Sequence, residues 1–263
     1  MTASCLTLLT DFGVADGYVA AMKGVILSRC ADVQLIDITH EIPPGDIRAA
    51  AYVLLQAVGT YPSGTVHLVV VDPGVGSERR ALACRGGDQL FVGPDNGVLA
   101  AALEDCTARQ AVVLTRPELW RESPSAVFHG RDVFAPVAAR LAAGGRLEEL
   151  GDAVDPATLI PRPWSDPERC GEEWIGEVIH VDRFGNLITN LPLDEEHAWA
   201  GELRVGALVL PLRRCYSDAP EGDLLGLRGS SGLLEIACNR GRAVERLGEG
   251  RGLVVSFRAS RGS

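Results

Sequence analysis

The chain has 263 residues, of which 46% are hydrophobic, and this is enough to bury the core of one large domain or of two smaller ones. Its formal net charge of −10 argues against a nucleic-acid or membrane-surface partner, because both bind through basic patches. The seven cysteines are widely spaced without a Cys-x-x-Cys pair, which predicts reduced thiols in a cytoplasmic protein rather than a disulfide framework or a zinc site. No apolar run has the length of a membrane span, and no leader is expected.

The first part of the chain alternates predicted strands with predicted helices. Apolar runs predict strands at residues 5–10, 34–38, 66–71, 90–92 and 111–114. Helical spacing predicts helices at residues 18–27, 47–58, from about 98, and 133–141. Asp46 and Asp132 are placed to cap the helices that follow them. This alternation predicts an α/β domain with a largely parallel central sheet.

The character of the chain changes after residue 155. Prolines cluster in residues 156–172 and the helical periodicity is lost, so we interpret this segment as a linker. Beyond it, short apolar runs predict strands at residues 176–181, 187–191, 203–212, 233–237 and 252–257. We therefore expect an α/β domain over residues 1–155, a linker over 156–172, and a small all-β, barrel-like domain over 173–263.

The stretch from Leu68 to Arg80 is the first candidate for a reaction centre. Four apolar residues predict a buried strand, and Pro73 ends it because proline has no amide donor for a sheet. Asp72 therefore lies at the carboxyl end of a core strand, where open α/β sheets bind their ligands. Arg79 and Arg80 follow in a glycine-containing loop. The alternative is a plain turn, since Asp at a strand end often binds its own backbone.

Further polar loops are candidates of lower specificity. Asp11 also follows a predicted strand, and His129 precedes a predicted helix. Residues 182–186 combine a carboxylate, an aromatic ring and an amide, a set that suits a nucleoside but also fits a hairpin turn. Residues 229–232 form a flexible polar loop or a simple connector. The chain has no P-loop and no His-Glu-x-x-His motif, and its five histidines are scattered, so no metal site is expected.

Taken together, the motifs closely resemble those of the S-adenosyl-L-methionine (SAM) hydrolase family, adenosine-forming, whose members are also called SAM hydroxide adenosyltransferases and are related to fluorinase and chlorinase. The resemblance spans nearly the whole chain. It rests on six ordered motifs: Thr10-Asp11-Phe12-Gly13, Asp37-Ile38-Thr39-His40-Glu41-Ile42-Pro43, Val71-Asp72-Pro73-Gly74-Val75-Gly76, Gly93-Pro94-Asp95-Asn96-Gly97, Phe128-His129-Gly130-Arg131-Asp132 and Asp182-Arg183-Phe184-Gly185-Asn186.

The resemblance implies site residues and a quaternary structure. It implies a water-activating triad of Asp72, Arg79 and His129, with Arg79 preferred to Arg80 because of its spacing from Asp72. It also implies a homotrimer, in which each active site lies between the N-terminal domain of one subunit and the C-terminal domain of the next. It implies contacts to the nucleoside and methionine from Asp11, Asp16, Asp182, Phe184, Asn186, Ser230, Glu235 and the backbone of Cys238.

The implied reaction is attack of water or hydroxide on C5′ of the SAM ribose, which releases L-methionine and leaves adenosine. The sulfonium leaves as a neutral thioether, so neither a general acid nor a metal or separate cofactor is expected. Arg79 would favour hydroxide, while Asp72 and His129 could orient the water or accept its proton; which group is the base stays open.

Three other functions remain to be weighed. Halide attack at the same carbon is disfavoured, because an anionic Asp72 would repel halide and the chain has no room for the fluorinase loop between Arg80 and the strand at Phe91. A SAM or adenosine sensor without turnover would not need the triad. A metal-dependent phosphoesterase would use Asp11, Asp72 and His129 as ligands.

Overall fold

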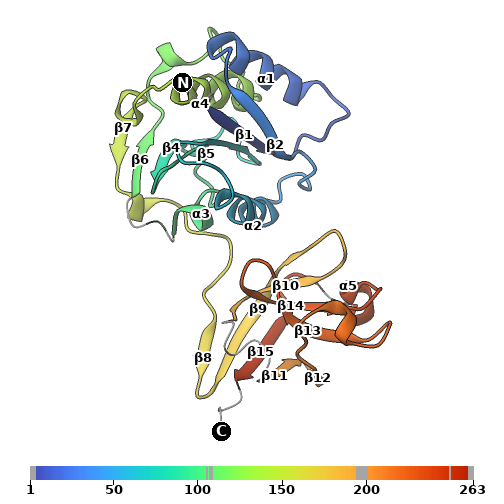
Figure 1. The fold of residues 1–263 in the computed structure, drawn as a ribbon. Coiled ribbons are helices and arrows are strands. Elements are labelled where there is room, and N and C mark those ends of the chain that lie inside the picture. The colour runs from blue at the N-terminus through green and yellow to red at the C-terminus, as the bar shows by residue number, and fades with distance from the viewer. Residues whose placement is uncertain (1–3, 105, 107–108, 194–200, 249, 260–263) are drawn as a thin grey trace. The chain divides into compact units, whose positions relative to one another are not determined.

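A seven-stranded sheet forms the centre of the first of two structural units, Met1–Pro163 and Trp164–Ser263 (Figure 1). The computed structural model describes residues 4–104, 106, 109–193, 201–248 and 250–259. The strands of the first sheet lie in the order β2-β1-β3-β5-β4-β6-β7. They are β1 (Cys5–Thr10), β2 (Gln34–Thr39), β3 (Val66–Val70), β4 (Ala81–Gly86), β5 (Gln89–Pro94), β6 (Arg109–Val113) and β7 (Asp152–Val154).

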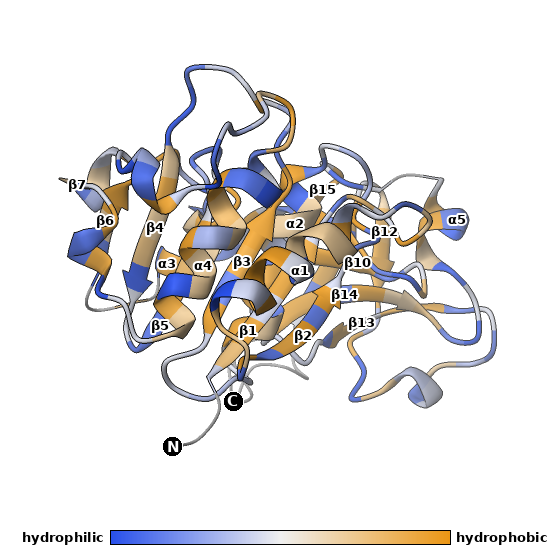
Figure 2. Ribbon diagram, turned by 90° about the horizontal axis from the view of Figure 1, so that it is seen from above, coloured by the Kyte–Doolittle hydropathy of each residue, from blue (hydrophilic) through white to orange (hydrophobic). Residues whose placement is uncertain are grey.

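Helices cover both faces of this sheet, and each face has its own apolar core. α1 (Tyr18–Arg29) and α4 (Ala135–Ala142) pack on one face, where Leu8 and Leu68 contribute to the core. α2 (Ile47–Val58) and α3 (Ala100–Glu104) pack on the other, where Leu9 and Val69 contribute. Neighbouring residues of one strand enter different cores because side chains alternate across a sheet. Figure 2 shows β1 and β3 largely in the hydrophobic colour, as strands buried on both faces require.

The central sheet is mixed, so the prediction of a largely parallel sheet was wrong. The pairs β1–β2, β1–β3 and β3–β5 are parallel, whereas β4–β5, β4–β6 and β6–β7 are antiparallel. Two of the antiparallel pairs involve β4 and the third involves β7, and neither strand was predicted from the sequence. A turn at Gly87 and Asp88 joins β4 to β5, since Gly86 pairs with Gln89. Such a two-residue glycine turn forms a hairpin and therefore reverses the chain direction.

The helix starts show one confirmed and one wrong prediction. The side chain of Asp46 accepts a hydrogen bond from Ala49 N and caps α2, as predicted. Asp132 does not cap a helix. It lies inside a short π-helix, Gly130–Phe134, that leads directly into α4. Its carboxylate instead accepts hydrogen bonds from Arg121, Arg131 and the backbone N–H of Ser125. The 3₁₀ turns of this unit are Pro117–Leu119, Leu147–Glu149 and Pro156–Thr158.

The second unit is a nearly closed antiparallel barrel. Its path is β12-β11-β15-β9-β10-β14-β13, with β8 paired to β9 outside the path. The two end strands approach each other through a bridge between Leu212 and Gly226. This contact leaves little open strand edge. The elements are β8 (Glu168–Cys170), β9 (Glu173–Val181), β10 (Leu187–Pro192), β11 (Gly201–Val205), β12 (Leu208–Leu210), β13 (Leu224–Arg228), β14 (Leu233–Cys238), β15 (Val254–Ala259), α5 (Ala243–Leu247) and the 3₁₀ turn Tyr216–Asp218.

Three features of this unit differ from the expected strands. Residues 203–212 form a hairpin of β11 and β12 rather than one strand, because Gly206 adopts a left-handed conformation with φ of 57° and turns the chain. β13 was not predicted, and neither was β8, which lies in the segment expected to be a linker. Within the described part of the chain, no helix combines the length and apolar character that a membrane span needs.

Candidate active site

The strand order of the first sheet explains why its polar loops meet. From β1 the chain passes to β2 on one side and then to β3 on the other side of β1. The two connections diverge here, and ligands bind open sheets at such a switch point, beyond the carboxyl ends of the strands. Asp11 follows the end of β1 and Asp72 follows the end of β3. Both carboxylates are thereby placed at this edge of the sheet.

Asp72, Arg79 and His129 form one hydrogen-bonded chain. Arg79 Nε lies 3.0 Å from both oxygens of Asp72, and Arg79 Nη2 lies 2.5 Å from Oδ2. The same Nη2 lies 2.9 Å from His129 Nδ1. Asp72 and Arg79 share one loop, His129 lies 50 positions further along the chain, and the arginine is the central member. Because a guanidinium has only donors, His129 Nδ1 accepts this bond, and the neutral ring carries its proton on Nε2.

The chain of three side chains is largely withdrawn from solvent. The side chains of Asp72 and Arg79 are 5% and 10% exposed. The Arg79 guanidinium also lies 5.2 Å above the centre of the Phe134 ring, a cation–π contact. Burial, followed by the positive charge of Arg79, lowers the pKa of His129 from its ordinary value of 6.5, against the raising effect of Asp72 and Asp132. The histidine is therefore neutral at physiological pH.

A cavity of about 390 Å³ opens beside these groups, and we call it the first pocket. The carboxylate of Asp11 at its edge accepts a hydrogen bond of 2.7 Å from Gly45 N, and one oxygen is left for a ligand. The other walls are mainly apolar. The lining residues are Asp11, Phe12, Pro44, Gly45, Val70, Asp72, Pro73, Val75, Val127, Phe128, His129 and Gly130.

The neighbouring Gly93–Gly97 motif holds this loop in place without entering the pocket. Asn96 Nδ2 donates to the carbonyl of Val71, 2.9 Å away, directly before Asp72. Arg80 does not contact Asp72. It lies 2.5 Å from Asp95 and also donates to the carbonyl of Thr158. The two adjacent arginines thus have different tasks, and Arg79 is the one that reaches the pocket groups.

The second unit has a cavity of about 440 Å³, which we call the second pocket. Asn186 is buried in the turn between β9 and β10, where its Nδ2 donates to Asp182 Oδ2 at 2.9 Å. Phe184 in the same turn is 74% exposed. An exposed ring beside a fixed amide suits a planar, polar ligand. The lining residues are Phe184, Asn186, Tyr216, Cys238, Arg240, Gly241 and Arg242.

Glu235 lies on β14 behind the second pocket. It is only 8% exposed, and burial together with the negative charge of Asp182 raises its pKa to about 7. A Cβ at Gly229 would meet the Glu235 side chain, so the 229–232 loop passes directly over this carboxyl group. Ser230 in that loop is exposed.

Sequence reasoning missed several pocket residues. Tyr216, Arg240 and Arg242 line the second pocket. Phe12 and Phe128 line the first and pack edge-to-face with 5.8 Å between ring centres. The phenylalanines stood inside motifs and could have been proposed. Nothing in the local sequence of the arginines pointed to a pocket. Asp16 is exposed and lines neither pocket.

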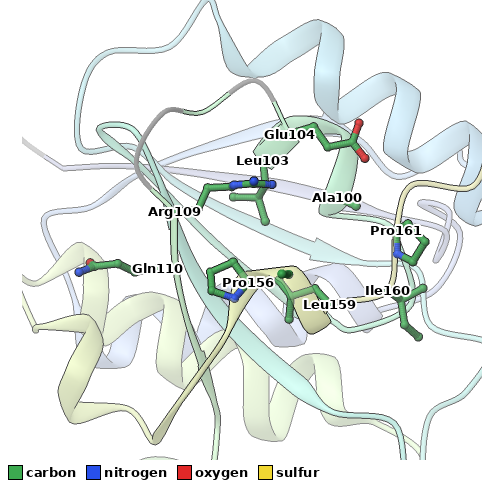
Figure 3. A pocket seen from close by; sticks show the side chains of 10 residues that line it. Ala100, Leu103, Glu104, Arg109, Gln110, Pro156, Leu159, Ile160 and Pro161 are labelled. Atoms are coloured by element: carbon green, nitrogen blue, oxygen red, sulfur yellow. The ribbon is translucent and has the colours of Figure 1, made fainter. Parts of the chain in front are cut away.

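A third, smaller cavity of about 170 Å³ lies between α3, β6 and residues 156–161 (Figure 3). Leu103, Leu159, Ile160 and two prolines give it mostly aliphatic walls, with Glu104 and Arg109 as its charged members. None of the predicted site residues lines it. Among the described residues, no three His, Cys, Asp or Glu side chains converge in a way that could hold a metal ion.

Comparisons with known protein families match most of the chain. Residues 6–151 match the SAM hydroxide adenosyltransferase N-terminal domain, and residues 176–256 match the C-terminal domain of the same name.

Individual relatives give the same picture. A protein of Salinispora arenicola named (R)-S-adenosyl-L-methionine hydrolase is 45% identical over 255 residues, which cover 92% of this chain and 93% of the relative. A protein of the same name from Thermus thermophilus is 44% identical and covers 94% and 96%. A fluorinase of Nocardia brasiliensis is 29% identical over 89% and 90%.

A solved structure has the same fold over nearly its whole length. The crystal structure of an uncharacterized conserved protein from Thermotoga maritima superposes with a TM-score of 0.87 at 37% identity. The alignment covers 96% of this chain and 99% of that one.

Proposed function

The chain belongs to the SAM hydroxide adenosyltransferase family, and from this we infer that it hydrolyses SAM to adenosine and L-methionine. The observation that carries the mechanism is the hydrogen-bonded chain of Asp72, Arg79 and His129 beside the first pocket. It sets acceptor and donor groups next to a mainly apolar cavity. A nucleophilic water needs both, one to take its proton and one to fix its direction.

We propose Asp72 as the group that accepts the proton of the attacking water. His129 Nδ1 is occupied by the N–H of Arg79, so the ring can accept a proton there only by breaking that bond. Asp72 is acceptor-only when ionised, and a carboxylate has more acceptor positions than the arginine fills. The Nε2–H of His129 then serves as a donor that orients the water oxygen.

The leaving group needs no help from an acid. Cleavage of the bond between C5′ and sulfur transfers an electron pair to the sulfonium, which departs as the neutral thioether of methionine. Hydroxide attack on a sulfonium removes charge, so a poorly hydrated pocket favours it. The apolar walls of the first pocket, among them Val70, Val75 and Phe128, provide such surroundings.

We propose that the protein residues that bind the substrate are divided between the first pocket and the second pocket. Asp11 binds the ribose hydroxyls through its unoccupied oxygen, and the adenine stacks on Phe184 beside Asn186 and the backbone of Cys238. Asp182 acts mainly by holding Asn186. The charged amino-acid part of SAM is assigned to Ser230, Glu235 and Asp16.

We further propose a homotrimer in which the first pocket of one subunit and the second pocket of a neighbouring subunit bind one SAM molecule. Co-expression of D72N with N186A chains tests this arrangement, provided that SAM is well below the wild-type KM, where each variant alone is weakly active. Random hybrid trimers would regain about a quarter of the wild-type sites if each site uses two subunits of a closed ring. No recovery would mean that each subunit provides a whole site, and light scattering would report the trimer itself.

The decisive test of the reaction is incubation of the purified protein with SAM. Adenosine and methionine should form in equal amounts, both with and without a chelator. 5′-Chloro-5′-deoxyadenosine at high chloride would instead indicate a halogenase, although the relatives named hydrolase are much more similar than the fluorinase. Tight SAM binding without turnover would indicate a sensor. A cytoplasmic location is proposed because all seven cysteines are unpaired.

A further inference from the structure

The segment from Arg121 to Asp132, which we call the 121–132 loop, is closed at its base by one residue. Arg121 N donates to the carbonyl of Asp132 and Arg121 Nη1 donates to its Oδ1, both over 2.9 Å. Within the loop, Ser125 N donates to Oδ2 of the same carboxylate over 2.9 Å. Asp132 thereby fixes both the start and the middle of the loop.

Asp132 is a buried charge with a full set of partners. Its side chain is 1% exposed, and Arg131 donates to both of its oxygens at 2.7 and 2.8 Å. The hydrogen bonds of Arg131, Ser125 and Arg121 lower its pKa to about 2. A charge this deeply buried is tolerated only when it is paired. The carboxylate therefore holds its hydrogen-bond donors in fixed positions.

The same loop carries one wall of the first pocket. The Arg131 guanidinium lies 4.8 Å above the centre of the Phe128 ring, which packs on Phe12 and on Tyr18. His129 follows Phe128 directly. The backbone N–H groups of Arg131 and Asp132 both donate to the carbonyl of Phe128. The ion-pair network and His129 are therefore parts of one short, tightly bonded stretch.

The loop also holds conformations that the local sequence does not favour. Ser123 has a φ of 54°, the left-handed region that side chains other than glycine rarely adopt. The carbonyl of Ala126 passes so close to Gly76 that a Cβ there would lie 2.8 Å from the oxygen. Such conformations persist only where the surrounding contacts enforce them, and the bonds from Arg121 and Ser125 to Asp132 hold the chain on both sides of Ser123.

We propose that Asp132, through Arg121 and Arg131, is a positioning residue that holds His129 in line with Arg79 and the attacking water. This role rests on the proposed hydrolysis of SAM. It has a simple physical basis: a displacement of about 1 Å in a reacting group can cost roughly 100-fold in rate. None of the three network residues needs to touch the substrate.

The test removes one partner from the network and leaves the fold intact. R121A keeps the backbone bond to Asp132 but loses the side-chain bond. R140A is the matched control, since Arg140 is equally exposed, 45% against 44%, and donates to Glu149 over a similar distance of 2.7 Å. We expect R121A to lower the single-turnover rate on SAM about 10-fold with an unchanged adenosine Kd. R121K should recover most of the rate, and R140A should lose none.

A second measurement follows His129 without any turnover. Asp72, Arg79 and Asp132 are the charged groups that act on its pKa. NMR titration of the His129 ring in ligand-free R121A should show a higher pKa, because Arg121 does not itself act on this pKa and a displaced ring loses the lowering charge of Arg79. Equal rates in R121A and wild type, or an unchanged His129 pKa in R121A, would overturn the proposal. A wild-type protein that does not hydrolyse SAM would defeat the proposed function while leaving the titration result to stand.

Discussion

The two pockets hold their polar groups in different ways. In the first, Asp72 and Arg79 are nearly buried and bonded to each other, and the aligned set ends on a neutral histidine. In the second, the polar groups lie on a turn and a loop, and Phe184 is 74% exposed. Groups that are fixed before a ligand arrives stabilise charge in a transition state without reorganisation. An exposed ring instead contributes binding free energy when it stacks on the ligand and both surfaces become buried.

This contrast supports the proposal that the chemistry takes place in the first pocket, where Asp11 alone serves recognition, and that the second pocket serves recognition. It also agrees with how each pocket is built. The first lies at the carboxyl ends of parallel strands, which are rigid and buried. The second is made by the β9–β10 turn and by residues that follow β12 and β14. Substitutions of Asp72 or His129 in the first pocket and of Asn186 in the second should therefore change different kinetic constants.

The largest effect is expected in the first pocket. D72N removes the proposed proton acceptor and should lower kcat by about 10²–10⁴-fold. H129A should lower kcat strongly as well, because it removes the donor that orients the water. Adenosine affinity, measured by calorimetry, should stay within about twofold in both, since loss of kcat alone marks an interaction made in the transition state. Full kcat in H129A would make this histidine a structural residue.

The pH dependence of kcat sharpens the same assignment. Protonation of His129 puts a proton on Nδ1 and breaks the bond from Arg79. Activity should thus fall as the pH drops through the His129 pKa, which burial and Arg79 place below the ordinary 6.5. The acid limb of the single-turnover rate should lie below pH 6.5 and vanish in H129A. An acid limb that persists in H129A belongs to another group.

A smaller effect is expected in the recognition residues. N186A and D11A each remove hydrogen bonds to the nucleoside, and loss of such a partner costs on the order of 1–3 kcal/mol, more for a charged group. The adenosine Kd should rise accordingly, by roughly 5- to 150-fold for that range. Single-turnover rates at saturating SAM should change much less. If N186A lowers the rate and leaves the Kd unchanged, the division of labour between the pockets is wrong.

Local patterns in the sequence were enough to predict much of the first unit. Residues 47–58 have helical spacing and a capping Asp46, and α2 has these bounds. The strand before Asp72 is similarly clear, since four consecutive apolar residues are followed by Asp72 and then by Pro73. β4 was missed because its alanines and its glycine are weak strand formers, although the Gly87–Asp88 turn after it is a hairpin signal.

The relations between distant residues could not be read in the same way. Fifty positions separate Arg79 from His129, and only the fold shows that one guanidinium bonds both the histidine and Asp72. The role of Asp132 shows the same limit. Its position before an apolar helical run is that of a cap, but its oxygens accept hydrogen bonds from two arginines and a backbone N–H instead. Tertiary contacts thus override a local preference.

The remaining effects concern stability alone and oppose each other in the two units. His67 is fully buried, stacked on Phe91, and burial lowers its pKa to about 4. Below pH 6.5 His67 binds a proton in the unfolded chain but not in the folded unit, so the first unit loses stability as the pH falls toward 4. Glu235 has the reverse sign. Its raised pKa of about 7 means that the folded unit keeps a proton that the unfolded chain releases above pH 4.5. The second unit therefore loses stability as the pH rises from 4.5 to 7.

Each shift corresponds to roughly 3 kcal/mol across its window. Hydrogen exchange followed by mass spectrometry between pH 4 and pH 8 reports the two units separately. The free energy of opening should rise with pH for β3 and fall with pH for β14. H67Q should flatten the first trend and leave the second unchanged, and E235Q should do the converse, because each glutamine cannot titrate. Parallel trends in the two units would mean that they unfold together, and slopes that survive both substitutions would assign the pH dependence to other groups.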